Sequence, residues 1–320
     1  MYNWLIKLYK TLKQKLKHLH QVIKYVKKQS GKLYIVILFD IIWCYIVYLL
    51  DLEEYKKLEF YNINHSLRKT YLNEAKHDLI KTFLYKKDNL VIINNKEKFL
   101  QRFKNYIKSE IVNINKISYK EFEETLMKNK KIICRSTNQS FVSSYEIYDA
   151  AKFRGPGFVL EKAKKNKLLL VEKYIDQHKK LKEITDNLVV INLVTMINKN
   201  NVDVISSYVT FKENNQIIRG YIDLKKEKTK GHFRDSNNNI YENISGEYEI
   251  PCLEEMIKFV KETAKEITEI KEVEWSLCLD TRGKIHLMDA TTWKQIIFAQ
   301  TPEYLNKKVG LLPYYKKIIK

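Results

Sequence analysis

Glycine and proline are scarce in this sequence of 320 residues, which contains 8 glycines and 4 prolines. No Gly-rich turn joins a strand to a helix, and this absence argues against a parallel doubly wound fold. The four cysteines stand far apart without a CxxC pair, so we expect reduced, buried thiols and neither a disulfide framework nor a zinc site. The seven histidines form no HxxxH or HExxH pattern, so this zinc signature is missing as well.

The charges are unbalanced, with 58 basic and 38 acidic residues and a formal net charge of +20. Such an excess predicts attraction to anionic partners, namely nucleotides, nucleic acids or an anionic membrane surface. The sequence has no stacking-aromatic motif and no helix-turn-helix, so we do not expect nucleic acid to be the partner. The hydrophobic content of 45% is typical of a globular protein.

Residues 1–32 contain nine lysines and no acidic residue. Their apolar residues recur every three or four positions, which predicts an amphipathic helix. These apolar residues are Leu5, Leu8, Leu12, Leu16, Leu19, Ile23 and Val26. Two interpretations stay open at this point: the helix lies on an anionic membrane surface, or it packs on its own domain with its lysines in water.

The next segment, residues 33–50, is an apolar run interrupted by a single charge, Asp40. Its length reaches the lower limit for a transmembrane helix. An aspartate near the middle of a span, however, costs roughly 2.5 to 3.5 kcal/mol on insertion scales. We therefore expect a helix buried within the protein rather than a membrane span. The run also starts too late, and lacks the small-residue exit, to be a cleavable signal.

Helical and strand-like patterns alternate along the rest of the chain. Residues 51–90 look helical, and Ser66 is the expected N-cap of their clearest stretch. Residues 89–93 predict a short strand, followed by a turn and a helix that begins at Lys96. A second capped helix is expected after Ser118. Further strands are expected at 130–137, 167–175, 187–197 and 202–211, and a long helix at 250–267. This order predicts an α+β fold with mixed sheets.

The stretch EWSLCLDTRGKIHLMDATTW, residues 274–293, predicts a hairpin around a Gly-containing turn. With a turn of two or four residues, Ser276 faces Asp289 and Glu274 faces Thr291, so all four side chains share one face. A three-residue turn would shift the register by one position and turn Glu274 away. Two carboxylates and a hydroxyl on one face can hold one Mg²⁺, completed by water and phosphate oxygens.

Several short signatures follow one another in order from about Asp40 to the C-terminus. They are NKEKF, KEFEETL before IICRS, LVEKYIDQH, EIPCLEEMIKFVKETAKEI, VEWSLCLDTRGKIHLMDAT and a later Gln300. In this order the chain resembles the ATP-grasp superfamily, and more narrowly the sugar-transfer-associated ATP-grasp proteins of bacterial surface-polysaccharide gene clusters. The resemblance implies an ATP-grasp fold, in which two α+β subdomains clasp a nucleotide, here with an N-terminal helical extension. The implied regions are a basic helical region at 1–85, a small lid-bearing subdomain at 86–170 and a C-terminal subdomain with the metal-site hairpin at 171–320.

ATP-grasp ligases activate a carboxylate with ATP, as an acylphosphate, and transfer it to an amine or thiol. The resemblance implies that Lys96 and Arg135 bind the phosphates and that Glu172 binds the nucleoside. The residues that would line the adenine are Lys173, Tyr174 and Ile175. No general base stands out, so the sequence assigns no catalytic residue.

The metal site implied by the resemblance consists of Asp289 with Glu274 or Thr291, holding Mg²⁺ on the β- and γ-phosphates. The family places a second acid at Ser276 and an asparagine at Thr291, so one acid of the usual two survives, and Glu274 is the nearest replacement. The stretch after Arg135, STNQSFVSSYEIYDAAKF, also contains no glycine where the family has a Gly-rich phosphate loop. These departures indicate a partly eroded site for both ATP and Mg²⁺.

The implied function is an ATP-dependent ligase-like protein that joins a carboxylate to an amine or a related nucleophile in cell-surface polysaccharide biosynthesis. The alternative is a catalytically inactive pseudoenzyme that binds a partner or ligand in the same pathway. The expected partners are a nucleotide, a sugar or amino-acid-like small molecule, and an anionic membrane surface through residues 1–32. The expected location is cytoplasmic, peripheral at the inner membrane face.

Overall fold

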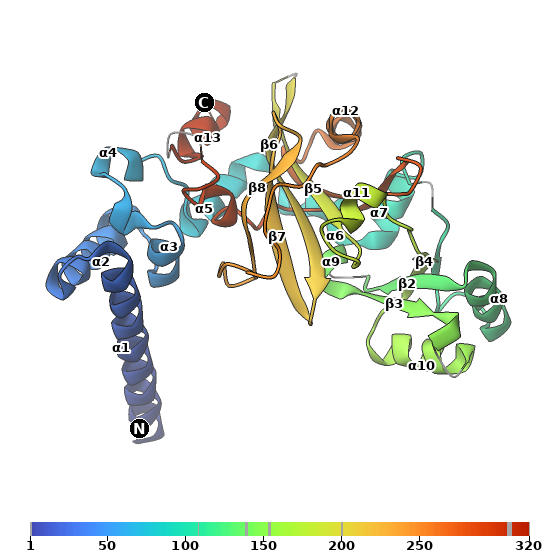
Figure 1. Cartoon of the computed structure of the whole chain (residues 1–320), viewed down its shortest axis with the longest axis horizontal. Coiled ribbons are helices and arrows are strands. Elements are labelled where there is room, and N and C mark those ends of the chain that lie inside the picture. The colour runs from blue at the N-terminus through green and yellow to red at the C-terminus, as the bar shows by residue number, and fades with distance from the viewer. Residues whose placement is uncertain are drawn as a thin grey trace. The chain divides into compact units, whose positions relative to one another are not determined.

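The computed structural model describes residues 2–107, 109–137, 140–152, 155–199, 201–305 and 309–319 (Figure 1). It confirms the predicted α+β class with an N-terminal helical extension, but the prediction of mixed sheets is wrong, because every strand pair in its two sheets is antiparallel. The chain divides into two compact units. Unit 1 comprises Met1–Phe83 and Lys294–Lys320, and unit 2 comprises Leu84–Trp293. Residues 171–320, expected as one region, are therefore shared between the two units.

Unit 1 consists of helices. They are α1 (Tyr2–Ser30), α2 (Tyr34–Tyr48), α3 (Leu52–Lys57), η1 (Phe60–Asn62), α4 (His65–Arg68), α5 (Glu74–Leu84), η5 (Phe298–Gln300) and α13 (Leu312–Ile319). Gln300 connects the C-terminal segment to the N-terminal helices by hydrogen bonds. Its side chain accepts hydrogen bonds from the Leu72 and Leu311 amides at 2.9 and 3.0 Å and donates one to the Leu72 carbonyl at 2.6 Å.

The first sheet of unit 2 has the strand order β1-β4-β2-β3. Its strands are β1 (Ile111–Asn113), β2 (Lys131–Arg135), β3 (Tyr145–Asp149) and β4 (Leu170–Lys173). Helices α8 (Tyr119–Asn129) and α10 (Pro156–Lys165) cover one face of this sheet through a buried apolar cluster. Ser118 caps α8 as predicted, because its side chain and that of Glu121 form a reciprocal capping box.

The second sheet of unit 2 has the order β10-β9-β5-β6-β7-β8. Its strands are β5 (Val190–Asn198), β6 (Asn201–Glu213), β7 (Gln216–Asp223), β8 (Lys228–Arg234), β9 (Glu272–Leu279) and β10 (Ile285–Thr291). One face packs against α7 (Lys96–Arg102) and α12 (Leu253–Ala264), with Trp275 at the centre of the core. The other face meets the first sheet through a smaller cluster that includes Ile133, Tyr145, Val190 and Met288.

The remaining short helices of unit 2 are η2 (Lys87–Leu90), α6 (Val91–Asn94), α9 (Phe141–Ser144), η3 (Ala150–Lys152), α11 (Lys179–Lys182) and η4 (Lys265–Ile267). The predicted strand at 89–93 is therefore wrong, since a short apolar run fits a buried helical turn as well as a strand. The predicted cap at Ser66 is also wrong: Asn64 caps α4 by accepting a hydrogen bond from the Leu67 amide at 2.9 Å. The four cysteines are free thiols, and three of them are buried.

Helix α2 differs from the expected buried helix. It buries Ile37, Ile41, Cys44 and Tyr48, but its other apolar residues are largely exposed. Asp40 explains why the run tolerates a charge, because it forms an ion pair with Arg68 on the inward side at 2.6 Å. Among the described residues, no single helix has the length and apolar character needed to cross a membrane. The helical segments Tyr9–Ser30 and Tyr34–Tyr48 reach this length and apolar character only when they are taken together, and the chain bends by 114° between them.

Candidate functional site

The hairpin of β9 and β10 has the predicted register around Asp289, but its turn length differs from the prediction. Asp289 pairs with Ser276, and Thr291 pairs with Glu274. The turn contains three residues, since the Asp280 amide donates to the Lys284 carbonyl at 3.1 Å. The predicted turn length of two or four residues is therefore wrong. A β-bulge between Leu287 and Asp289 adds one residue and restores the register.

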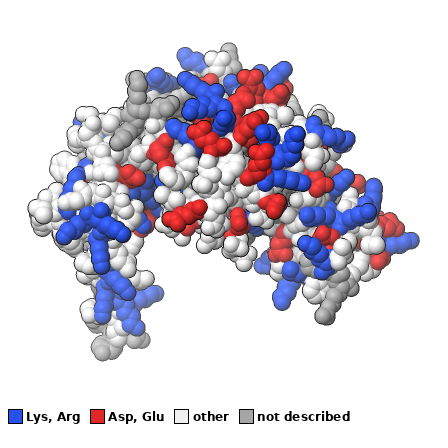
Figure 2. All heavy atoms as spheres, viewed as in Figure 1, with Lys and Arg blue, Asp and Glu red and all other residues white. Residues whose placement is uncertain are grey.

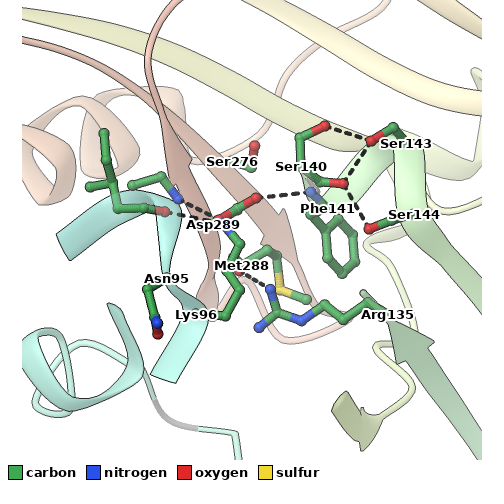
Figure 3. Close-up of polar contacts among 12 residues, drawn as sticks. Asn95, Lys96, Arg135, Ser140, Phe141, Ser143, Ser144, Ser276, Met288 and Asp289 are labelled. Carbon is green, nitrogen blue, oxygen red and sulfur yellow. Dashed lines mark hydrogen bonds and ion pairs between the residues drawn. The ribbon is translucent and has the colours of Figure 1, made fainter. Parts of the chain in front are cut away.

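Asp289 is fully buried, and its carboxylate is already occupied by donors from this chain (Figure 3). Lys96, at the first turn of α7, forms an ion pair with its Oδ1. The Phe141 amide donates to Oδ2 at 2.8 Å, and the Ala290 amide donates to Oδ1 at 2.9 Å. Asn95 holds the start of α7 in place by capping it through the Glu97 and Lys98 amides. The cation next to Asp289 is therefore the Lys96 ammonium.

Arg135 and Glu172 form a second buried ion pair beside the first. The Arg135 Nε lies 2.9 Å from the Glu172 Oε1, in poor alignment for a hydrogen bond, and its Nη1 donates to the Met288 carbonyl at 2.9 Å. The guanidinium also lies over the Phe141 ring, 5.6 Å from the centroid. Its Nη2 is buried and has no hydrogen-bond acceptor among the described residues. This donor is therefore open to a further acceptor, whereas Nε is already engaged in the ion pair with Glu172.

The four charged side chains influence one another as a single cluster. Burial lowers the pKa of Lys96, the attraction of Asp289 counteracts it, and the positive charge of Arg135 lowers it further. Burial raises the pKa of Glu172, Arg135 opposes this effect, and the negative charge of Asp289 adds to it. Two positive and two negative side chains thus lie together in a low-dielectric interior, where the charged forms of Lys96 and Glu172 depend on their oppositely charged neighbours.

The polar residues next to Asp289 on the same sheet face have partners of their own. The Ser276 hydroxyl donates to Asn192 Oδ1 at 2.9 Å, and Asn192 Nδ2 donates to the Thr210 hydroxyl at 2.8 Å. Glu274 lies beside Tyr208, whose pKa is raised by burial and then by the negative charge of this carboxylate. The polar side chains of this sheet face are therefore mostly buried, and they are paired within the protein.

This arrangement does not fit Mg²⁺. The two oxygens of Asp289 already accept three donors, and Glu274 is turned to Tyr208. Within the described ranges, no group of three or more His, Cys, Asp or Glu side chains is placed to hold a metal ion. Thr291 supplies only a hydroxyl, which is a weak ligand without neighbouring carboxylates.

A cavity of about 760 Å³ lies next to the cluster of four charges. Glu172, Lys173, Tyr174 and Ile175 all line it, so the segment that the resemblance assigns to the nucleoside faces an open space. This volume is within the usual range for small-molecule sites. The other lining residues are Ser109, Glu110, Val112, Ile117, Glu121, Glu124, Thr125, Lys128, Asn129, Val171, Asp176, Asp280, Thr281, Arg282, Lys284 and His286. Lys96 and Arg135 are not among them.

The hairpin turn supplies a polar wall of this cavity that the sequence did not indicate. Asp280 accepts hydrogen bonds from the Arg282 and Lys284 amides at 2.9 and 3.0 Å and pairs with His286 Nε2 at 3.1 Å. Burial alone would raise the pKa of Asp280, but His286 and the two amides outweigh it and lower the pKa. The DTRG turn was visible in the sequence, but its closeness to the Glu172 strand depends on tertiary packing.

No protein-family profile matches the sequence, and no curated protein matches it significantly. Several solved structures match part of this chain at low similarity. N5-carboxyaminoimidazole synthase from Aspergillus clavatus, solved with ADP and an aminoimidazole ribonucleotide, has a TM-score of 0.42 and 10% identity over 69% of this chain and 50% of that one. D-alanyl-alanine synthetase A from Vibrio cholerae has a TM-score of 0.43 and 10% identity over 71% and 65%.

An L-amino acid ligase from Bacillus licheniformis is similar at a TM-score of 0.41 and 12% identity, over 72% of this chain and 49% of the ligase. This chain therefore spans about half to two thirds of the length of the solved proteins that it matches. Similarity at this level assigns no substrate to this chain, and the residues described above have to carry its function.

Proposed function

We propose that the chain is a diverged ATP-grasp protein, an ATP-dependent carboxylate–amine ligase-like protein of cell-surface polysaccharide biosynthesis with a partly eroded site. The observation that carries the proposal is the meeting of Lys96, Arg135, Glu172 and Asp289. They come from four separate segments of the sequence, and the resemblance selects all four as site residues. A chance selection of charged residues would lie scattered over the surface, where most such residues are found.

The nucleotide is proposed to enter the cavity beside Glu172, with its base along Lys173–Ile175. Tyr174 offers an aromatic surface there, and Lys131 already lies 3.9 Å from the centroid of its ring. The Nη2 donor of Arg135 would suit an anionic ligand oxygen, since a buried donor without an acceptor costs about 1 to 3 kcal/mol, but Arg135 is 0% exposed and does not line the cavity. Exposed Lys173 at the cavity wall can neutralise a further phosphate.

ATP, when bound, would supply the phosphoryl group that activates a carboxylate. This chain's own residues would bind and orient it: Lys173 contacts the anionic end, and Glu172 positions the nucleoside. Arg135 is buried and does not line the cavity, so it could contact the anionic end only after the cluster opens. No step is assigned to Mg²⁺, because Asp289, Glu274 and Thr291 do not fit the ion. The second substrate is proposed to be a sugar or amino-acid-like small molecule.

A second candidate, binding without turnover, is favoured by the contact between Lys96 and Asp289. Lys96 can neutralise a phosphate only if it leaves Asp289, and Asp289 can hold a metal only if it leaves Lys96. Since both side chains are nearly inaccessible, 3% and 0% exposed, the arrangement opposes both steps. The protein would then bind a nucleotide or another ligand in the cavity as a pseudoenzyme of the same pathway.

Calorimetric titration of the full chain with ATP, with and without Mg²⁺, separates these candidates when combined with an assay for ADP release. We expect ATP to bind, and Lys173→Gln to weaken binding about tenfold, the order expected for a lost charge-assisted hydrogen bond. Lys179→Gln, on the exposed surface of α11 outside the cavity, is the matched control. Binding with ADP release supports the ligase, and binding without it supports the pseudoenzyme. The absence of any binding heat at millimolar ATP would refute nucleotide binding.

The location is proposed to be cytoplasmic, with peripheral contact at the inner membrane face through residues 1–32. Figure 2 shows basic side chains along α1, and the described part of this helix carries no acidic residue. Anionic lipid headgroups attract such clusters by about 1 kcal/mol for each lysine near the surface.

A further inference from the structure

One side of α2 is an exposed apolar surface. The exposed hydrophobic residues from 33 to 49 are Leu33, Tyr34, Ile35, Val36, Phe39, Ile42, Trp43, Tyr45, Ile46, Val47 and Leu49. Several are more than half exposed, including Phe39 at 65%, Trp43 at 52% and Ile46 at 66%. Contiguous exposed apolar patches of this kind mark sites of contact with a membrane or another protein.

The one charged group of α2 is turned away from this surface. Asp40 accepts hydrogen bonds from Arg68 Nη1 and Nη2 at 2.6 and 2.8 Å and from the Tyr55 hydroxyl at 2.7 Å. Arg68 in turn donates to the Phe60 carbonyl, which anchors the inner side of α2 in unit 1. The outer side therefore carries no charge, although the helix contains one.

A strongly basic helix adjoins this apolar surface in the same unit. Its exposed side chains include Lys7, Lys10, Lys13, Lys15, Lys17, Lys24, Lys27 and Lys28. Its first half also exposes Tyr9, Leu12 and Leu16, while Val22, Ile23 and Val26 in the second half are buried against unit 1. An apolar surface beside a cluster of lysines is complementary to the acyl boundary and headgroups of an anionic membrane.

We propose that the exposed face of α2, residues 33–49, inserts into the interface of an anionic lipid bilayer while the lysines of α1 bind its headgroups. This inference rests on the peripheral location proposed above and names the element that gives the contact its apolar part. A helix of 15 residues is about 22 Å long at about 1.5 Å per residue, shorter than a hydrocarbon core of about 30 Å. The bend of 114° and the Asp40–Arg68 pair suit a helix lying along the surface.

Co-sedimentation of the full chain with vesicles tests this proposal, using phosphatidylcholine alone and phosphatidylcholine with one third phosphatidylglycerol. We expect binding to the anionic vesicles, weaker at high salt because the lysine contacts are screened. Phe39→Ser/Trp43→Ser/Ile46→Ser should lower the partition coefficient at least tenfold and leave the thermal midpoint unchanged, since all three side chains are exposed. The matched control is Leu79→Ser/Phe83→Ser, at two α5 positions that are 65% and 66% exposed.

Trp43 gives a direct signal of insertion. In a Trp4→Phe background, its emission should shift to the blue on anionic vesicles and be quenched by brominated acyl chains. Trp275 and Trp293 are already buried, so they contribute a constant background.

Each result has a defined meaning. Loss of binding in Lys10→Gln/Lys13→Gln/Lys17→Gln, with the α2 triple variant unaffected, would leave a purely electrostatic contact of residues 1–32 and overturn the role of α2. No vesicle binding at all would overturn both the α2 inference and the peripheral location.

A dimer in solution that the α2 triple variant converts to a monomer, without vesicle binding, would show that a second copy covers the surface and would also overturn the inference. Because ATP binding is measured in unit 2, these outcomes are independent of the nucleotide proposal.

Discussion

Removing one partner of the Lys96–Asp289 pair should destabilise unit 2 far more than removing both. The ion pair is suitable for this experiment because its side chains are 2% and 0% exposed. Lys96→Met keeps the length of the side chain and removes its charge. Asp289→Asn keeps the shape of the carboxylate and removes its charge. The double variant removes both charges, so no uncompensated charge is left at this position.

The expected magnitudes follow from the surroundings of each charge. An uncompensated buried charge costs about 3 to 5 kcal/mol of unfolding free energy. Lys96→Met leaves Asp289 with the Phe141 and Ala290 amides as donors, so we expect the lower end of this range. Asp289→Asn leaves the Lys96 ammonium close to Arg135, which already lowers its pKa, so we expect the upper end. The double variant should lose less than either single variant, because it leaves neither charge uncompensated.

The pH gives a second signature of the same pair. Without Asp289, burial and Arg135 lower the pKa of Lys96 without opposition. The ammonium then loses its proton as the pH rises, and the penalty of Asp289→Asn becomes smaller. The penalty of Lys96→Met should not shrink in this way, because methionine does not titrate.

Urea unfolding followed by the fluorescence of buried Trp275 and Trp293 measures these effects in unit 2. Lys116→Met is the control, since Lys116 pairs with Glu97 at 2.7 Å but both side chains are more than half exposed. Its midpoint should equal that of the wild type. Single-variant losses below about 1 kcal/mol, or strictly additive losses in the double variant, would refute the view that Lys96 and Asp289 act as one buried pair.

Three further predictions concern other parts of the chain. Below about pH 4, unfolding free energy should fall as the pH passes through the lowered pKa of Asp280, and Asp280→Asn should flatten this part of a urea-midpoint profile; an unchanged slope contradicts it. Gly220→Ala should cost about 1 to 3 kcal/mol in urea unfolding, because a Cβ would lie 2.5 Å from the buried Phe233 ring; a neutral effect contradicts it. Asp40→Asn should lower the stability of unit 1 by on the order of 2 kcal/mol in thermal unfolding, since the buried guanidinium loses its counter-ion, and an unchanged midpoint contradicts this.

Local patterns identified much of unit 2 from the sequence alone. The α8 cap at Ser118 was predictable because a capping box is a contact between residues three apart. Strands β5, β6, β9 and β10 of the larger sheet were predictable because their apolar runs are long and rich in β-branched residues, whereas β7 and β8 were not predicted. The 89–93 segment was not, because four apolar residues carry no clear period.

The composition of residues 33–50 predicts a buried helix, but one face of α2 is exposed. An apolar run with a central aspartate satisfies the description of a buried helix, and the sequence contains no sign that only one side is covered. The covering depends on Arg68, which reaches Asp40 from 28 positions further along the chain. Because of this contact, Asp40 lies on the inner side of α2, and the exposed side of the helix carries only uncharged side chains.

The hairpin register was predicted correctly for a reason that was partly wrong. A three-residue turn alone would have moved Asp289 out of line with Ser276, and the bulge at Met288 cancels that shift. The same bulge exposes the Met288 carbonyl to Arg135 Nη1. Turn length could be guessed from the sequence, but a compensating bulge and the contact that uses it could not.

The candidate site itself depends on which anion each cation contacts, and no sequence pattern specifies this choice. The resemblance assigns Lys96 to a phosphate, yet its ammonium is neutralised by the carboxylate expected to hold the metal. A phosphate and Asp289 must compete for the same ammonium, so the contact that stabilises the buried cluster also opposes Mg-ATP. Arg135 differs, because its pairing with Glu172 leaves one buried donor open. Once the buried cluster opens to the cavity, a ligand anion could therefore use this Arg135 donor without breaking an ion pair, whereas it can reach Lys96 only by displacing Asp289.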